Sequence, residues 1–302
     1  MELPDYIKNR YWKDFLPPGI SLELDIPEDK CLRDLFEEGA KLYGNQIAIN
    51  FYLKKEYTFQ ELNDLTYRFA HGLLNLGVKK GDVIAIWLPN SPQFSIAYFA
   101  ALSIGAIVTA LSPLFVAREA VHQINDSGAK ILIMIDRFFR QYKKMREEIK
   151  IEILILSNIE GDVPKQAEED EIIHWNSLMD QNPVPKPLPE VQIDPKKDIA
   201  IIQYTGGTTG LPKGALLTHY NIVANIYQIK EIADYMKNEY IKGPLIALSV
   251  LPWYHIYGQT CEMALSPITG AKAFVFPTFD AEMVLKTLKE FKPNSMLGVT
   301  TM

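Results

Sequence analysis

The chain has 302 residues, of which 48% are hydrophobic and 23% are charged, and its formal net charge is −6. This composition is typical of a globular protein with one large domain or two smaller ones. The negative net charge argues against a nucleic-acid-binding protein, which needs a basic surface. The two cysteines, Cys31 and Cys261, are too few for a disulfide framework, so we expect a cytoplasmic protein.

The first regular elements are predicted after residue 28. A helix over residues 29–43 and a short strand over 46–52 flank a Gly-Asn turn. Thr58 and Glu61 form the capping-box pattern of a helix N-terminus, in which each side chain bonds to the backbone N–H of the other residue. Gly77 suits the left-handed position that ends such a helix.

The segment from Val83 to Ala117 contains no charged residue, which raises the question of a membrane span. A spanning helix needs about 20 mostly apolar residues in a row. Here prolines, a glycine and polar residues interrupt the run, and it divides into a strand (83–88), a helix beginning after Ser91, and a second strand (106–111). Nearly continuous apolar runs are typical of buried parallel strands, so we predict no transmembrane segment.

Strands and helices continue to alternate as far as residue 156. The predicted elements are a helix over 117–125, a strand over 130–135, a basic helix over 137–150 and a strand over 151–156. This alternation predicts an α/β fold with a parallel sheet and helices on both faces. Residues 159–197 are acidic and then rich in proline, which is typical of a semi-rigid surface connection. We predict no metal site there, because no His or Cys interleaves with the acidic residues.

The most informative stretch is Tyr-Thr-Gly-Gly-Thr-Thr-Gly-Leu-Pro-Lys-Gly, residues 204–214, which follows a predicted buried strand at 199–202. Its glycines let the backbone turn tightly and approach another molecule closely. Exposed N–H groups in such a turn form a concavity that binds anions, and the threonine hydroxyls and Lys213 add further donors. The stretch therefore predicts a phosphate-binding loop. It is not the G-x-x-x-x-G-K-[ST] loop, because Pro212 and Gly214 stand at two of the fixed positions of that motif.

A second candidate lies after an apolar strand predicted at 245–251, which follows a helix predicted at 220–237. There the sequence Pro-Trp-Tyr-His-Ile-Tyr-Gly, residues 252–258, places His255 beyond the carboxyl end of a strand, where ligands bind in open α/β sheets. The residues alone leave a structural and a functional role open for this histidine. A strand at 272–276 and a helix at 280–291 follow. The remaining histidines lack partners at metal-ligand spacing and are interpreted as structural or surface residues: His71, His122, His174 and His219.

Residues 204–214 resemble the phosphate-binding signature of the adenylate-forming superfamily of acyl-CoA synthetases, coumarate-CoA ligases, luciferases and peptide-synthetase adenylation domains. Gly206 stands where that family often has serine. Residues 251–258 are similar to the family segment whose histidine lies beside the acyl carboxylate. Other landmarks of the family match in order along essentially the whole chain: residues 57–62, 81–83, 88–91 and 105–106, followed by Pro113.

The resemblance implies a fold and a chemistry. It implies two stacked subdomains with mostly parallel sheets flanked by helices, one containing residues 72–190 and the other residues 28–71 and 196–302. It also implies ATP, Mg²⁺ and CoA: a carboxylate attacks the α-phosphorus of ATP, and a thiol then displaces AMP from the acyl adenylate. His255 would be the catalytic residue that orients the carboxylate, and Tyr257 and Cys261 would line the acyl pocket. The residues implied for phosphate binding are Thr205, Gly206, Gly207, Thr208, Thr209, Gly210 and Lys213.

Members of this family are considerably longer, so residues 1–302 are expected to be an incomplete N-terminal AMP-binding domain that is inactive alone. We expect a fatty acid as the substrate, because the stretch around the proposed acyl pocket is apolar and aromatic. Two alternatives stay open: a coumarate-type aryl-CoA ligase, and a non-catalytic half-protein that binds a nucleotide or an acyl ligand. The sequence also leaves a homodimer open.

Overall fold

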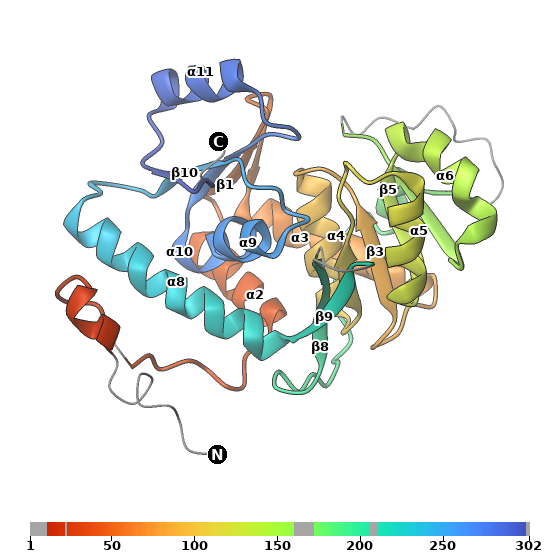
Figure 1. Ribbon diagram of the computed structural model, residues 1–302, viewed down its shortest axis with the longest axis horizontal. Coiled ribbons are helices and arrows are strands. Elements are labelled where there is room, and N and C mark those ends of the chain that lie inside the picture. Colours follow the sequence, from red (N-terminus) through yellow and green to blue (C-terminus); the bar gives the residue numbers. More distant parts are fainter. Residues whose placement is uncertain (1–10, 22, 160–171, 206–210, 300–302) are drawn as a thin grey trace.

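Two β-sheets with helices packed between and around them form the framework of the protein. The computed structural model describes residues 11–21, 23–159, 172–205 and 211–299. Within these residues the strands form a seven-stranded sheet and a five-stranded sheet. The two sheets lie in neighbouring lobes of the molecule (Figure 1). The expected α/β fold with two mostly parallel sheets is therefore confirmed.

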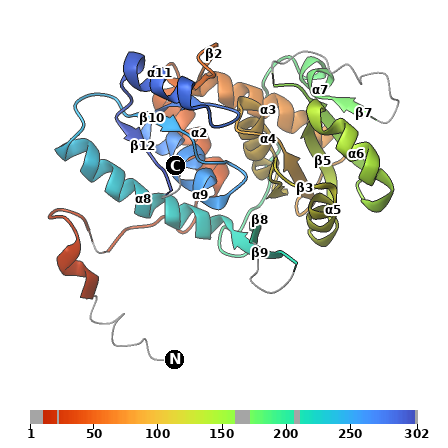
Figure 2. The ribbon, with the colours of Figure 1, turned by 45° about the horizontal axis from the view of Figure 1, so that its top comes forward.

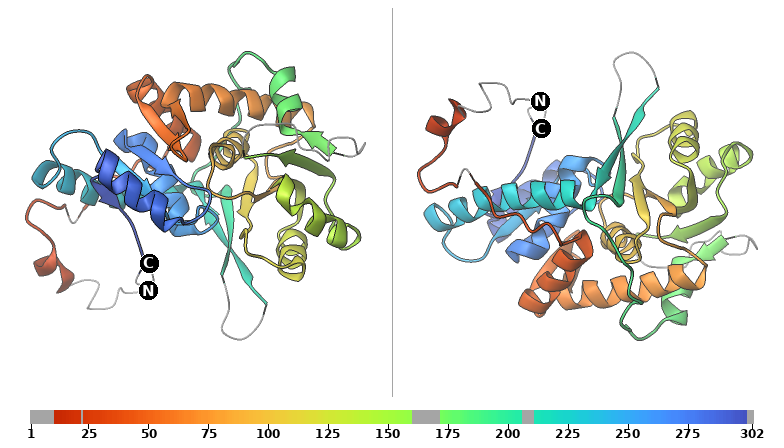
Figure 3. Two further views of the ribbon diagram at one scale, coloured as in Figure 1. Left: turned by 90° about the horizontal axis from the view of Figure 1, so that it is seen from above. Right: turned by 90° about the horizontal axis from the view of Figure 1, so that it is seen from below.

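The seven-stranded sheet has the order β7-β6-β5-β3-β4-β8-β9, and every neighbouring pair in it is parallel except β8 and β9. Its strands are β3 (Val83–Trp87), β4 (Ile107–Ala110), β5 (Ala129–Ile135), β6 (Ile153–Ser157), β7 (Ile172–His174), β8 (Ile199–Thr205) and β9 (Lys213–Thr218). The antiparallel β8–β9 hairpin extends away from the body of the fold (Figure 3).

The five-stranded sheet has the order β12-β10-β11-β1-β2, with only the β1–β2 pair antiparallel. Its strands are β1 (Ile47–Phe51), β2 (Lys55–Thr58), β10 (Ile246–Ser249), β11 (Lys272–Val275) and β12 (Ser295–Met296). Helix α11 (Ala281–Phe291) lies beside this sheet at the outer end of its lobe (Figure 2). Because β1, β10 and β11 run parallel, their carboxyl ends lie at one edge of the sheet.

Helix α4 (Pro92–Ser103) joins the two halves of the core, and every one of its residues is buried. Ser91 caps this helix by accepting a hydrogen bond from the Phe94 N–H at 3.2 Å. Phe99 stacks on Phe36 with ring centroids 4.1 Å apart, and Phe94 meets Trp253 edge to face at 6.0 Å. A helix that is apolar all round is expected in a core, which accounts for the uncharged run at 83–117. None of the helices in the described ranges is long and apolar enough to cross a membrane.

The remaining helices cover the outer faces of the sheets and the gap between them. The α-helices are α2 (Leu32–Tyr43), α3 (Phe59–Asn75), α5 (Ala117–Asp126), α6 (Phe139–Met145), α7 (Trp175–Gln181), α8 (His219–Glu239), α9 (Ile256–Gly258) and α10 (Ser266–Thr269). The short 3₁₀-helices are η1 (Tyr11–Phe15), η2 (Asp136–Phe138) and η3 (Arg146–Glu148), and η4 (Gln259–Ala264) is a π-helix.

Several expectations need correction. The stretch at 159–197 is not simply a surface connection, because its described part contains β7 and α7, and Trp175 is buried and stacks on Phe69 at 4.0 Å. The predicted basic helix at 137–150 consists of α6 flanked by two 3₁₀ turns. The division into subdomains stays a prediction, but β8 and β9 pair with the seven-stranded sheet, so the sheet boundary lies after residue 218 and not at 196.

Candidate functional site

The strand that leads into the glycine-rich stretch meets the His255 segment through two glutamines. The Nε2 of Gln259 donates to the Oε1 of Gln203 on β8 at 3.3 Å and to the carbonyl oxygen of Tyr254 at 3.3 Å. Both glutamines are buried. Residues more than fifty positions apart in the sequence are thereby held together, at the carboxyl ends of β8 and β10.

One face of the hairpin carries the side chains that suit an anion. Thr205 and Lys213 are directly paired across β8 and β9, and Gln203 is paired with Ala215. Because side chains alternate along a strand, Gln203, Thr205 and Lys213 all emerge on the same face. Thr205 and Lys213 are exposed. Their hydroxyl and ammonium groups therefore lie on the face that Gln203 turns toward the His255 segment.

The other face of the hairpin is fixed to helix α5. The hydroxyl of Tyr204 donates to Asp126 at 2.6 Å, and the Tyr204 ring meets His122 edge to face. Burial and the Asp126 carboxylate raise the pKa of Tyr204 above its usual range, so the phenol stays protonated. A ring nitrogen of His122 lies 2.8 Å from the carbonyl oxygen of Pro212. These contacts anchor both ends of the glycine-rich stretch to α5.

Gly214 is required by the same packing. A Cβ at this position would lie 2.7 Å from the Cγ2 of Ile202 and 3.1 Å from the Tyr204 ring. These distances are shorter than van der Waals contact, so Gly214 gives Tyr204 the room to lie across the hairpin.

The segment before His255 is held by a buried asparagine from the connection between β3 and α4. The Nδ2 of Asn90 donates to the Leu251 carbonyl oxygen at 2.8 Å, and the Oδ1 of Asn90 accepts from the Trp253 N–H at 2.7 Å. Gly258 lies against this segment, because a Cβ there would come within 2.4 Å of the Pro252 carbonyl oxygen. The turn therefore closes tightly enough to return the chain directly into α9.

His255 lies at the N-terminus of α9 with an exposed side chain. Its Nδ1 accepts a hydrogen bond from the Tyr257 N–H at 3.3 Å, which leaves Nε2 as the ring nitrogen that carries the proton in the neutral form. An exposed Nε2–H can donate to a carboxylate. The structure thus gives His255 an orientation suited to the proposed carboxylate contact.

The two residues implied for the acyl pocket lie in different surroundings. Cys261 is buried in η4 and lines a cavity of about 40 Å³ together with Leu248, Leu265 and Leu297. Burial raises the pKa of the Cys261 thiol, so it stays protonated and unreactive. Tyr257, by contrast, is 37% exposed and does not line this cavity. The structure therefore brings Cys261 but not Tyr257 to an apolar cavity.

Gly206, Gly207, Thr208, Thr209 and Gly210 lie outside the described residues. In the part of the chain that is described, no three His, Cys, Asp or Glu side chains are grouped so that they could hold a metal ion.

Sequence reasoning missed the residues that join the site together. It interpreted His122 as structural or surface and gave no role to Gln203, Asn90 or Gln259. Each of them contacts a residue more than fifty positions away, with the exception of the Gln259 bond to Tyr254. No local pattern marks such contacts, although Asn90 lies within a landmark that the family resemblance does include.

Comparisons with known proteins identify the family of this chain. The AMP-binding enzyme family matches residues 36–302. A long-chain-fatty-acid-CoA ligase from Bacillus subtilis is 32% identical over 96% of this chain and 54% of its own length. A probable 4-coumarate-CoA ligase from Dictyostelium discoideum is 33% identical over 79% of this chain and 44% of its own length. This chain therefore spans about half the length of the curated relatives it matches.

A solved structure shares the fold. The crystal structure of a long-chain-fatty-acid-CoA ligase from Archaeoglobus fulgidus superposes with a TM-score of 0.76 at 24% sequence identity, covering 91% of this chain and 52% of that one. At this identity the likeness shows the fold alone.

Proposed function

The chain belongs to the AMP-binding enzyme family, and from this premise we propose that it carries the phosphate-binding and carboxylate-binding parts of an ATP-dependent fatty-acid-CoA ligase. One observation carries the proposal: Gln203 and Gln259 hold the β8–β9 hairpin against the turn that bears His255. An anion-binding hairpin and an exposed histidine side by side suit a reaction in which a carboxylate meets a triphosphate.

In this proposal Lys213 and Thr205 hold the β- and γ-phosphates of ATP, together with the glycine-rich residues 206–210. Positive charge and N–H donors there would stabilise the negative charge that develops on pyrophosphate as it leaves. His255 would donate its Nε2–H to the carboxylate and fix the direction of its approach. Two anions repel each other, so fixed donors on both sides are a chemical requirement of the step.

Mg²⁺ and CoA belong to the proposed reaction as the family uses it. Within the described residues, no three His, Cys, Asp or Glu side chains are grouped as metal ligands. A bound magnesium ion prefers oxygen ligands such as those of a triphosphate. The thiol of CoA would displace AMP in the second step. We place this chemistry in the cytoplasm.

A fatty acid is the favoured substrate, supported by the similarity to the Bacillus subtilis long-chain-fatty-acid-CoA ligase. The cavity at Cys261, about 40 Å³, is too small to hold an acyl chain by itself. An aryl acid is the second candidate, supported by the similarity to the Dictyostelium coumarate-CoA ligase.

Exchange of labelled pyrophosphate into ATP tests the proposal, measured with the protein at the length it has in its native source. We expect exchange that depends on an added fatty acid, and a series of fatty and aryl acids identifies the substrate class. Nucleotide binding without exchange for any acid would contradict the proposed activity and favour a non-catalytic binding protein.

A further inference from the structure

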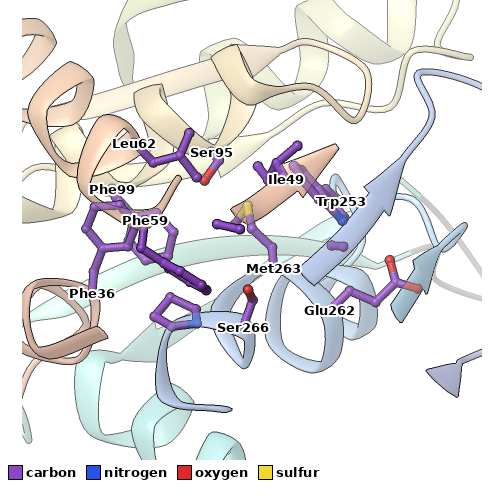
Figure 4. A pocket seen from close by; sticks show the side chains of 13 residues that line it. Phe36, Ile49, Phe59, Leu62, Ser95, Phe99, Trp253, Glu262, Met263 and Ser266 are labelled. Atoms are coloured by element: carbon purple, nitrogen blue, oxygen red, sulfur yellow. The ribbon is translucent and has the colours of Figure 1, made fainter. Parts of the chain in front are cut away.

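Glu262 is a buried carboxyl group that the proposed reaction does not use. It lies in the π-helix η4, seven residues after His255, and is 9% exposed. Figure 4 shows its side chain turned away from the aromatic cluster of Phe36, Phe59 and Phe99. The Glu262 side chain instead reaches the end of β10.

The Glu262 carboxyl group accepts hydrogen bonds from three consecutive residues. Its Oε2 accepts from the Ser249 hydroxyl at 2.5 Å, and its Oε1 accepts from the N–H groups of Val250 and Leu251 at 3.3 and 3.2 Å. Strand β10 ends at Ser249, so these two N–H groups lie beyond its sheet pairing. Buried N–H groups need a partner, and Glu262 supplies it for both.

The contact extends toward His255 through a tryptophan. The Nε1 of Trp253 donates to the Ser249 hydroxyl oxygen at 3.1 Å, so Ser249 links Trp253 to the carboxyl group. Asn90 holds the same turn from its other side, at Leu251 and Trp253. The backbone from 249 to 253 is thus fixed on both sides, and His255 follows two residues later.

The burial of the Glu262 carboxyl group lowers the stability of the folded state when that group is ionised. Burial raises the pKa of Glu262 to about 7 in spite of its hydrogen bonds, which means that the folded state disfavours the ionised carboxylate. The neighbouring titratable group is the Cys261 thiol, which is itself protonated. A π-helix is also rare and is frequently found at functional sites. A feature that lowers stability and recurs at functional sites calls for a role other than stabilising the fold.

We propose that Glu262 is a positioning residue: it fixes the turn at residues 249–253 and, through that turn, the place of the His255 ring. The role in catalysis rests on the proposed function, whereas the structural link between Glu262 and His255 does not.

The link is tested in the 302-residue chain by NMR, with Glu262→Met as the variant and Glu282→Met, on the exposed first turn of α11, as the matched control. Methionine has about the length of glutamate but carries no oxygen, so the N–H groups of Val250 and Leu251 lose the acceptor that they share. We expect amide hydrogen exchange at Val250 and Leu251 to become about tenfold faster and the His255 ring resonances to shift. The control should change neither.

Unchanged exchange at the two amides would overturn the proposal, and so would faster exchange with unmoved His255 resonances. Faster exchange throughout the protein would indicate general destabilisation and would also overturn it. If Glu262→Met does not fold, Ser249→Ala serves instead, because it removes the hydroxyl link and leaves the carboxyl group in place. A smaller shift of the same His255 resonances is then expected, and no shift would overturn the proposal.

The catalytic consequence is read separately, in acid-dependent pyrophosphate exchange by the native-length protein. Glu262→Met should slow the exchange, but it should add nothing once His255 is alanine, because residues that act through one another are not additive. Additive losses would contradict positioning through His255. A wild-type protein without exchange would defeat the proposed function and leave the NMR result standing.

Discussion

The side-chain amide of Gln259 donates to the side-chain oxygen of Gln203 across 3.3 Å, and this contact joins the π-helix η4, just after the His255 turn, to strand β8, which leads into the glycine-rich stretch. Both side chains are buried, so neither amide can turn to bulk water if the contact is lost. The relative position of the hairpin and the histidine therefore depends on this pair.

Gln203→Leu is expected to lower the free energy of unfolding by about 1–3 kcal/mol, because it leaves the buried Gln259 amide with one partner fewer. Urea unfolding of the single variants Gln203→Leu and Gln259→Leu and of the double variant measures the coupling. We expect the double variant to lose less than the sum of the single losses. Strict additivity would mean that the two side chains do not depend on each other.

His255→Ala is expected to slow acid-dependent pyrophosphate exchange about 10- to 100-fold, because the carboxylate loses a fixed donor. ATP affinity should stay within about twofold, since His255 is assigned to the carboxylate and not to the phosphates. His71→Ala is the control, because His71 lies beside the Lys186 carbonyl oxygen, away from the candidate site. A large loss of ATP affinity in His255→Ala would contradict the assignment.

Gly258→Ala is expected to displace the His255 turn, because the new Cβ would lie 2.4 Å from the Pro252 carbonyl oxygen. Overpacking of this kind typically costs about 1–3 kcal/mol. Thermal unfolding measures the loss of stability, and the chemical shifts of the His255 ring report the displacement. If the variant keeps both the stability and the His255 chemical shifts of the wild type, the turn can accommodate a Cβ at residue 258, and the close approach to Pro252 is contradicted.

His219 makes the stability of the fold depend on pH. It is buried, its Nδ1 accepts the Leu32 N–H at 3.4 Å, and burial lowers its pKa from 6.5 to about 4. The unfolded state therefore binds this proton more tightly than the folded state does. The His219 contribution is complete above pH 6.5 and is lost as the pH falls from 6.5 through about 4, by on the order of 3 kcal/mol.

The difference in unfolding free energy between the wild type and His219→Asn isolates this contribution, because the raised pKa of Glu262 has the opposite pH dependence in an overlapping range. Asparagine retains a hydrogen-bond acceptor for the Leu32 N–H but does not titrate. We expect the difference to shrink as the pH is lowered from 7 to 4. A difference that does not vary with pH would contradict the assignment to His219.

Sequence patterns correctly predicted those helices and strands whose boundaries are set by neighbouring residues, such as caps, prolines and glycines. The Thr58–Glu61 capping box forms with both hydrogen bonds, and the run at 83–111 divides into β3, α4 and β4 as its prolines and glycine indicated. Strand β9 was missed because Lys213–Thr218 is short, contains a glycine and, among the described strands, pairs with β8 alone. Neither the β8–β4 pairing nor the Gln203–Gln259 contact has a local pattern, because both depend on how the sheets assemble.

Calorimetric titration of the 302-residue chain with ATP and with AMP measures whether Lys213 binds the phosphates as proposed. The comparison is between the wild type, Lys213→Ala and the exposed-lysine control Lys289→Ala. Because Lys213 is assigned to the β- and γ-phosphates, its loss should weaken ATP binding about tenfold or more and AMP binding less than about twofold. The control should bind both nucleotides as the wild type does. Equal losses of ATP and AMP affinity in Lys213→Ala would contradict the account.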